Sequence, residues 1–297
     1  MLSANLARIE VHNHILSPAE AEIRITVLPL DLPDEVELRG RLVGPHCQYA
    51  STVEVAYPFR PLPGPRAKTG NLTARVIIPE PSFWDPESPL LYHGSLEVWK
   101  AGSRCWATEV SHGLRVLRLG KSGLRCNGRP LTVRGVPRQR LSAEDALQLR
   151  AEGYNTLLSD VSLETADLWD AADRFGFLVL GRLSATPAAF HQAESLKFHA
   201  CCLGWLLPPE ALELSALPGE LVRLQGGGDQ LLGLELDRRL PGRLLQPFQF
   251  VFAKEGLLPL EAEAQRPVLL KASLPSGPGE GSGQGAALSG ILGWIAE

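Results

Sequence analysis

The sequence predicts a multidomain protein: a β-sandwich over residues 1–120, followed by a shortened, irregular (β/α)8 barrel over residues 121–297. Three observations predict this combination of β and α/β folds. Apolar and polar residues alternate in short runs through the first third of the chain. Strand-like and helix-like runs alternate after it. The chain has 297 residues, which suits two cores, since single cores stop growing beyond about 250–300 residues.

Four runs in the first domain show the period of two that a half-buried strand requires. They are residues 21–28, 53–57, 72–78 and 91–99. Clusters of Pro, Gly and Asp at residues 32–34 and 61–65 separate them, and these residues favour turns over sheet ladders. Short strands at this spacing predict a β-sandwich.

The second domain alternates strands with helices. A helix is predicted over residues 142–153, with Ser142 as its N-cap and Gly153 as its stop, and another over residues 162–176. Eight runs are strand-like: residues 131–133, 156–159, 177–180, 201–207, 231–236, 248–252, 268–270 and 291–295. Alternation of this kind predicts a parallel sheet, and eight strands predict a barrel.

The barrel is short of residues. Residues 131–297 number 167, against about 250 in a typical (β/α)8 barrel. We therefore expect short or missing helices in its second half, or an incomplete barrel. The Gly- and Ser-rich residues 275–285 follow the seventh strand, where they form either a lid or a flexible loop.

Composition excludes several classes of function. The net charge is −4, which predicts no nucleic-acid partner. No apolar run approaches the roughly 20 residues of a membrane helix, and no signal peptide is evident, so we expect no membrane partner and a cytoplasmic location. The five cysteines are scattered, which predicts reduced thiols. His12 and His14 lack a third ligand and no phosphate-binding loop is present, so we expect no metal and no cofactor.

One stretch is strongly basic. Residues 115–140 carry eight Lys or Arg and no acid. We interpret them as outward positions of the linking strands, with an acidic partner or an anionic glycan as the alternative.

Three ordered motifs at the junction resemble glycoside hydrolase family 2. They are residues 83–92 (FWDPESPLLY), 111–116 (SHGLRV) and 124–136 (LRCNGRPLTVRGV). The first follows the family pattern W-x-P-x-x-P-x-L-Y. The resemblance implies that the sandwich is immunoglobulin-like and precedes a catalytic barrel, and that the family's usual sugar-binding domain is missing from this sequence.

The resemblance also implies where two catalytic carboxylates belong, an acid/base and a nucleophile about 5–5.5 Å apart. Glu210 matches the acid/base after the fourth strand, but the preceding family Asn is Pro209, which lacks a side-chain donor and a backbone N–H. Residues 266–272 (RPVLLKA) match the nucleophile motif, and Ala272 stands where the nucleophilic Glu should be.

Other charged positions of the family differ while the framework residues match. The family's R-G-V-N-R-H-E is RGVPRQR over residues 134–140, and the acid expected at the end of strand three is Arg182. Random decay would damage framework and site alike. The sequence therefore predicts a barrel retained for something other than hydrolysis of the family type.

Four further residues are candidate substrate-binding positions. Trp205 and Trp294 match strand-four and strand-eight positions that line sugar sites in the family, although core packing is the alternative for a buried Trp. Arg138 follows the first strand and Asp160 ends the second, where barrels place their chemistry. Three other acids lie near strand ends and could replace the nucleophile: Glu235, Asp237 and Glu255.

Three functions remain open. The first is a pseudoenzyme that binds a glycan or a protein partner. The second is a weak or altered glycosidase that hydrolyses O-glycosyl bonds, with Glu210 as general acid/base. The third is a structural or assembly domain without a ligand. The sequence names no oligomeric state.

Overall fold

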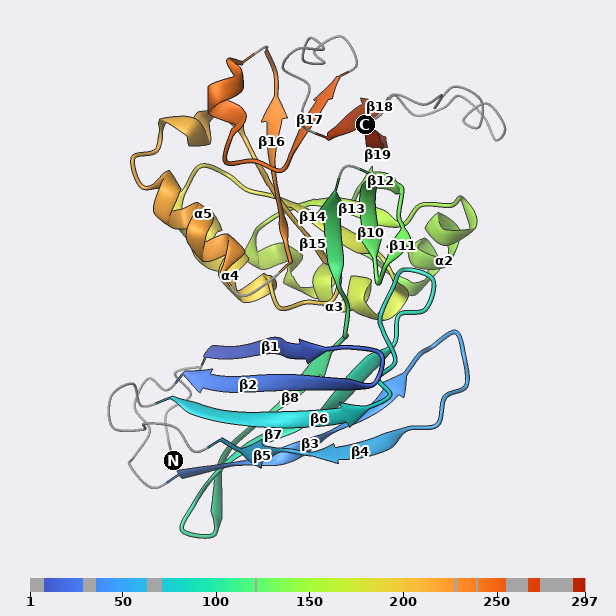
Figure 1. Ribbon diagram of the computed structural model, residues 1–297, viewed down its shortest axis with the longest axis vertical. Coiled ribbons are helices and arrows are strands. Elements are labelled where there is room, and N and C mark those ends of the chain that lie inside the picture. The colour runs from blue at the N-terminus through green and yellow to red at the C-terminus, as the bar shows by residue number, and fades with distance from the viewer. Residues whose placement is uncertain are drawn as a thin grey trace. The chain divides into compact units, whose positions relative to one another are not determined.

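The computed structural model describes residues 8–28, 36–62, 71–120, 122–226, 229–238, 240–254, 267–272 and 291–296. The chain divides into two compact units, Met1–Leu114 and Arg115–Glu297, which are described separately (Figure 1). The predicted boundary between residues 120 and 121 falls inside the second unit.

Two four-stranded antiparallel sheets build the first unit. One has the order β1-β2-β6-β5, from Arg8–Leu16, Glu20–Leu28, Leu72–Pro79 and Arg60–Pro61. The other has the order β4-β3-β7-β8, from Val55–Pro58, Val36–His46, Leu91–Lys100 and Ser103–His112. The prediction of antiparallel β-structure in this part of the chain is confirmed.

A single apolar core is shared by both sheets. Ile23 and Ile25 of β2 are fully buried, as is Val76 of β6 in the same sheet. They belong to one cluster with Leu42 of β3 and Leu96 of β7 from the other sheet. Alternating side chains of each strand therefore meet between the sheets, as the period of two predicts.

The second unit begins with a small antiparallel sheet and continues into a closed parallel barrel (Figure 1). The small sheet has the order β11-β10-β9, from Arg129–Pro130, Gly123–Cys126 and Leu117–Gly120. The barrel strands β12 to β19 are Val133–Pro137, Thr156–Asp160, Leu178–Arg182, Cys202–Leu207, Leu231–Leu236, Phe250–Lys254, Val268–Ala272 and Ile291–Ala296. β12 pairs with β19 and closes the barrel, so the prediction of eight parallel strands is confirmed.

Helices follow the first four barrel strands. They are α2 (Ala143–Ala151), η1 (Leu163–Thr165) with α3 (Ala166–Phe175), α4 (Pro187–Leu196), and η2 (Pro209–Glu213) with α5 (Leu217–Gln225). Among the described residues after β16, only the short 3-10 helix η3 (Gly242–Leu245) is present. Residues 255–266 and the Gly-rich 275–285 lie outside the described part of the chain.

The orientation of the barrel side chains follows from strand register. Trp205 of β15 packs on Trp169 of α3, so its side of the strand faces the helices outside the barrel. Gly181 is the register partner of Trp205, and register partners point to the same side of the sheet. Because side chains alternate along a strand, the next residue, Arg182, faces the barrel interior. The strand register from β15 through β16 to β17 places Phe250 and Phe252 on the same inward side. Both rings are almost fully buried. The barrel is a packed core rather than a pore.

Helix α2 begins with the predicted N-cap. Ser142 Oγ accepts a hydrogen bond from the Asp145 backbone N–H at 3.1 Å, and Asp145 Oδ2 accepts one from the Ser142 backbone N–H at 3.3 Å. This reciprocal pair satisfies two donors that the first helical turn leaves without a partner.

Ser142→Ala removes this cap and is expected to lower the free energy of unfolding by about 1 kcal/mol. Urea denaturation followed by circular dichroism measures the loss. Ser111→Ala on the exposed face of β8 serves as the control and should change the free energy by less than about 0.5 kcal/mol. Equal effects of the two substitutions would contradict the role of Ser142 as a cap.

Candidate functional site

A chain of ion pairs lies at the carboxyl end of the barrel. Asp160 ends β13 and Arg182 ends β14, and the two residues are neighbours in register. Glu235 of β16 and Lys271 of β18 continue the chain from strands farther along the sequence. We refer to these four residues as the mouth network. The carboxyl ends of the strands are where barrel enzymes carry their chemistry.

The mouth network runs from an exposed end to a buried end. Arg182 Nη1 lies 3.9 Å from Asp160 Oδ1, and Arg182 Nε lies 3.3 Å from Glu235 Oε2. Lys271 Nζ donates a hydrogen bond to Glu235 Oε1 and lies 5.0 Å from the centre of the Phe252 ring. Side-chain exposure falls from 60% at Asp160 through 36% at Arg182 to 17% at Glu235 and 13% at Lys271.

Gln139 ties the exposed end of the network to the loop after β12. Its Nε2 donates to Asp160 Oδ2 at 2.9 Å, while its Oε1 accepts from Ser159 Oγ at 3.1 Å and from the Asp160 backbone N–H at 3.2 Å. The Asp160 carboxylate is therefore fixed by Gln139 as well as by Arg182.

The network balances two carboxylates against two cations. Glu235 is held between Arg182 and Lys271, and each of its two carboxylate oxygens faces one of these cations. Both oxygens therefore act as acceptors toward protein donors in this arrangement. At the exposed end, Asp160, Gln139 and Arg182 offer acceptors and donors to a polar ligand.

The two implied catalytic positions lie outside this network. Glu210 is an exposed residue of η2, directly after Pro209, which begins that 3-10 helix. Ala272 is the last residue of β18 and pairs in register with Ala296. Within the described residues, Glu210 makes no ion pair with the mouth network.

The predicted aromatic platforms pack away from the mouth. Trp205 is fully buried, and its ring centre lies 5.6 Å from that of Trp169 at an interplanar angle of 35°. Trp294 is half-buried and meets Tyr154, the residue before β13, edge to face at 5.7 Å. Trp205 thus has the packing of a core residue and offers no ring face to a ligand.

The remaining predicted positions are dispersed. Arg138 is exposed, and its Nη1 donates to the carbonyl of Pro137 at 2.9 Å. Asp237 is exposed just after β16, whereas Glu255 lies outside the described residues. Of the four predicted substrate-binding residues, only Asp160 belongs to the mouth network. No role was predicted for Lys271 from the sequence. It directly precedes Ala272, the implied nucleophile position, and this placement could have identified it as a site residue.

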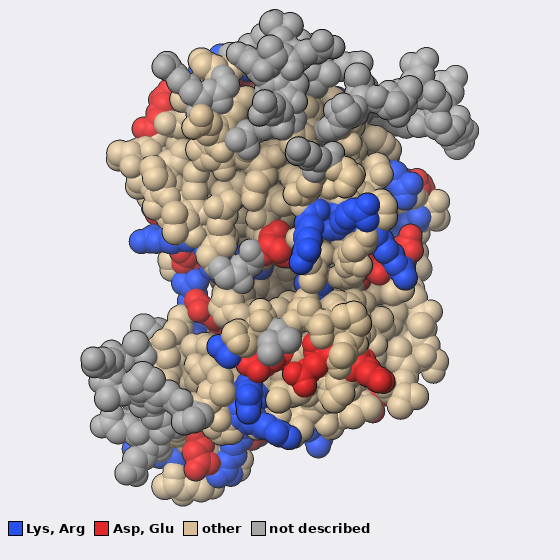
Figure 2. Space-filling view, viewed as in Figure 1, with Lys and Arg blue, Asp and Glu red and all other residues tan. Residues whose placement is uncertain are grey.

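The basic stretch faces outward for the most part, but its first residue, Arg115, is buried and lies 3.3 Å from Asp229. Arg118, Arg129, Arg134 and Arg138 are all exposed. Figure 2 shows Lys and Arg side chains gathered on one face of the second unit, over the region of β10 to β12.

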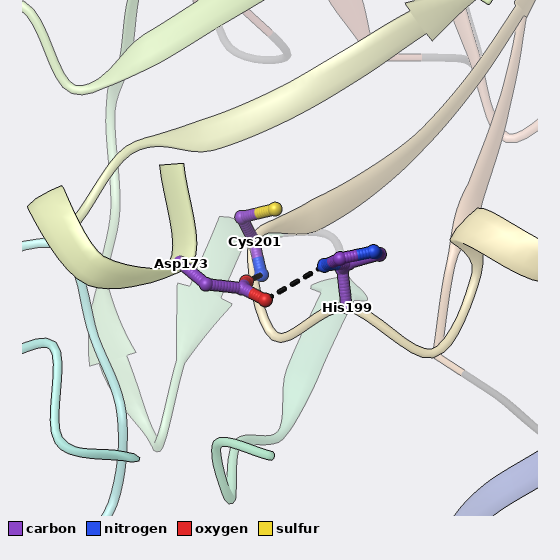
Figure 3. Close-up of side chains that lie close together, drawn as sticks. All are labelled: Asp173, His199 and Cys201. Carbon is purple, nitrogen blue, oxygen red and sulfur yellow. Dashed lines mark hydrogen bonds and ion pairs between the residues drawn. The ribbon is translucent and has the colours of Figure 1, made fainter. Parts of the chain in front are cut away.

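A second polar cluster lies at the amino end of β15, opposite the mouth network (Figure 3). Asp173 Oδ1 accepts a hydrogen bond from the Cys201 backbone N–H at 2.6 Å, and Asp173 Oδ2 lies 2.8 Å from Nδ1 of His199. Burial lowers the pKa of His199, but the neighbouring Asp173 carboxylate outweighs it and the net shift is upward. Burial, and secondarily Asp173, raises the pKa of the Cys201 thiol well above its usual range.

This second cluster was missed in the sequence because 26 residues separate Asp173 from His199. All five cysteines are free thiols. Among the described helices, none combines the length and apolar character that crossing a membrane requires.

Comparisons with known proteins place the chain near glycosidases. No protein-family profile matches it. A β-galactosidase from Klebsiella pneumoniae (strain 342) is 24% identical over 215 residues, covering 60% of this chain and 21% of that protein. A second β-galactosidase from Klebsiella pneumoniae is 23% identical over 169 residues, covering 46% of this chain and 16% of its own length. The matches thus span about a fifth of the curated relatives.

Solved structures agree on the fold. A glycosyl hydrolase family 2 member from Bacteroides cellulosilyticus superposes with a TM-score of 0.69 at 14% identity, covering 97% of this chain and 43% of that one. A β-glucuronidase from glycoside hydrolase family 2 gives a TM-score of 0.64 at 14% identity, with 90% and 31% covered. In its sequence motifs, its curated relatives and its fold, the chain resembles proteins of glycoside hydrolase family 2.

Proposed function

We propose that the chain is a non-catalytic relative of family 2 glycosidases that binds a glycan at the carboxyl end of its barrel. One observation carries the proposal: Glu235, a carboxylate at the barrel mouth, is committed to Arg182 and Lys271. A retaining glycosidase needs one carboxylic acid that donates a proton and one free carboxylate that attacks the sugar.

The implied catalytic positions support the loss of hydrolysis. Ala272 presents a methyl group where the nucleophile belongs, and a methyl group cannot attack an anomeric carbon. Pro209 removes the amide that would hold a substrate hydroxyl beside Glu210. Arg182 replaces the acid expected at the end of strand three and brings a positive charge to the mouth.

The exposed end of the network supports glycan binding. Gln139 and Arg182 fix the Asp160 carboxylate, so its oxygens are held in place before a ligand arrives. Fixed acceptors beside amide and guanidinium donors suit the adjacent hydroxyls of a sugar, because little side-chain freedom is lost on binding. The similar proteins are named as β-galactosidases and β-glucuronidases, which act on sugars.

The first unit would then be the family's immunoglobulin-like sandwich. If β1 to β8 are lettered A, B, C, C′, D, E, F and G in chain order, the two sheets have the strand orders ABED and C′CFG. These are strand orders of immunoglobulin-like domains. Tyr92, near the start of β7, accepts a hydrogen bond from the Ser82 backbone N–H at 2.9 Å. This contact has the form of the tyrosine corner, which immunoglobulin-like domains place at the start of strand F.

A weak or altered glycosidase is the second candidate. Glu235 favours it, because a carboxylate at a strand end could serve as a relocated nucleophile with Glu210 as the acid. Turnover of aryl β-glycosides that disappears in Glu210→Gln would establish this activity and overturn the proposal.

A glycan array followed by calorimetry on the best ligand tests the binding function. Asp160→Ala and Gln139→Ala are each expected to weaken binding about five- to tenfold, since a hydrogen bond contributes about 1 kcal/mol. Arg129→Ala, an exposed change on β11, is the matched control and should leave the affinity unchanged. If no glycan binds, the chain is instead a structural or assembly domain. If all three variants lose affinity equally, the glycan site is not at the barrel mouth.

A further inference from the structure

We infer that Asp173, His199 and Cys201, joined by Asp170, form a binding site for a divalent transition-metal ion of the zinc class. The site lies at the amino end of β15, whereas the proposed glycan site lies at the carboxyl ends of the strands. It is therefore independent of the proposed function.

Three ligand atoms of different chemistry already converge there. One atom each from Asp173, His199 and Cys201 lies within 4.8 Å of the others. Zinc binds oxygen, nitrogen and sulfur at about 2.0–2.3 Å, which places neighbouring ligands of a tetrahedral ion roughly 3.3–3.8 Å apart. Closing the cluster on an ion thus requires movements of about 1 Å, within the reach of side-chain rotation.

Asp170 supplies the fourth ligand. It precedes Asp173 by three residues on α3, so the two carboxylates lie on one face of the helix. Asp170 Oδ1 is 4.0 Å from His199 Nδ1, and its side chain is 71% exposed. The exposed Asp170 and the partly exposed His199 give an ion a route from solvent to the buried Asp173 and Cys201.

The backbone prepares the deeper half of the site. The Cys201 N–H holds Asp173 Oδ1, which leaves Oδ2 turned toward His199 Nδ1 (Figure 3). Cys201 Sγ lies 3.5 Å from the carbonyl oxygen of Trp169, to which it donates its proton. A carboxylate and an imidazole thus already face each other beside a thiol.

Binding of the ion balances as a proton displacement. The thiol of Cys201 loses its proton to solvent and becomes the thiolate ligand. The imidazole of His199 binds in its neutral form through Nδ1. The Nδ1 proton that Asp173 Oδ2 accepts in the free protein therefore shifts to Nε2, or leaves for solvent where the ring carries both protons. The positive charge of the bound ion compensates the negative charge of the buried thiolate.

The donor set selects the metal class. A thiolate and an imidazole favour zinc and similar ions over magnesium and calcium, which prefer oxygen ligands. Two carboxylates and one thiolate also give the site more negative charge than the ion is positive, so it discriminates against monovalent cations.

Cobalt(II) titration of the reduced full-length chain tests the inference, because cobalt reports thiolate ligation through an absorption band in the near ultraviolet. We expect one equivalent to bind, and zinc to displace it. Cys201→Ser should abolish the band. Cys202→Ser is the matched control, since Cys202 is an equally buried thiol outside the cluster, and it should retain the band.

Asp170→Asn provides a second variant at an exposed position where folding is not at risk, and it should weaken cobalt binding about tenfold or more. Absence of the band in the wild-type chain would overturn the inference. So would a band that survives Cys201→Ser, a band that is lost equally in Cys202→Ser, or unchanged affinity in Asp170→Asn.

Discussion

Replacing Glu235 with leucine is expected to lower the free energy of unfolding by about 3 kcal/mol. The substitution leaves Lys271 and Arg182 without the carboxylate they share, in a site where the Lys271 side chain is only 13% exposed. Removing one partner from a buried ion pair costs more free energy than the pair itself contributes. The figure is at the lower end for buried pairs because Arg182 is 36% exposed and retains contact with water. Urea unfolding monitored by Trp fluorescence measures it.

A double variant separates this explanation from simple loss of packing. Glu235→Leu combined with Lys271→Met removes both partners, and its destabilisation should be at least about 1 kcal/mol smaller than the sum of the single effects. Glu213→Leu, an exposed acid of η2, is the matched control and should change stability by less than about 0.5 kcal/mol. Additive single effects would show that Glu235 and Lys271 are not coupled.

Gly204→Ala is expected to destabilise the barrel by about 4 kcal/mol or more, enough to reduce the yield of folded protein. Gly204 has φ +154°, and a Cβ atom there would lie 2.0 Å from the carbonyl oxygen of Leu231. Because the clash is with backbone, β15 and β16 would have to separate along their shared ladder. Thermal unfolding and soluble yield measure the effect.

Gly219→Ala is the matched control for this substitution. Gly219 lies in α5, and a Cβ atom there would meet nothing within 4 Å. Alanine is the better helix former, so the change should be neutral or stabilising by up to about 1 kcal/mol. A Gly204→Ala chain as stable as the wild type would contradict the strand register in this part of the barrel.

The barrel strands were predictable because they are apolar on both faces. The predicted run 231–236 coincides with β16, and the run 156–159 falls short of β13 by one residue. A strand buried on both sides reads as a continuous apolar segment. In the first unit, β3 was not predicted, since Gly40, Gly44 and Pro45 interrupt its alternation. β8 was missed because only two of its ten residues, Val110 and His112, are buried, so its apolar alternation is weak.

The candidate site was only partly predictable. The strand ends predicted from the sequence indicate Asp160 and Glu235 as site residues. The contact between Glu235 and Lys271 was not predictable in this way, because the two residues lie on different strands and are 36 positions apart. Whether Trp205 faces the mouth or the helices depends on the register of β15, and a one-residue shift reverses it. Asp173 and His199 come from different elements, which the pairing of β14 with β15 brings together.

Non-catalytic binding at the barrel mouth requires that a bound glycan forms no covalent intermediate with the protein. Intact mass spectrometry can detect such an intermediate after incubation with the 2-deoxy-2-fluoro glycosyl fluoride of the best-binding sugar, a reagent that traps a glycosyl-enzyme on a nucleophilic carboxylate. We expect the mass of the wild-type chain to stay unchanged. A mass increase of one glycosyl group that is lost in Glu235→Gln would show instead that the mouth is catalytic.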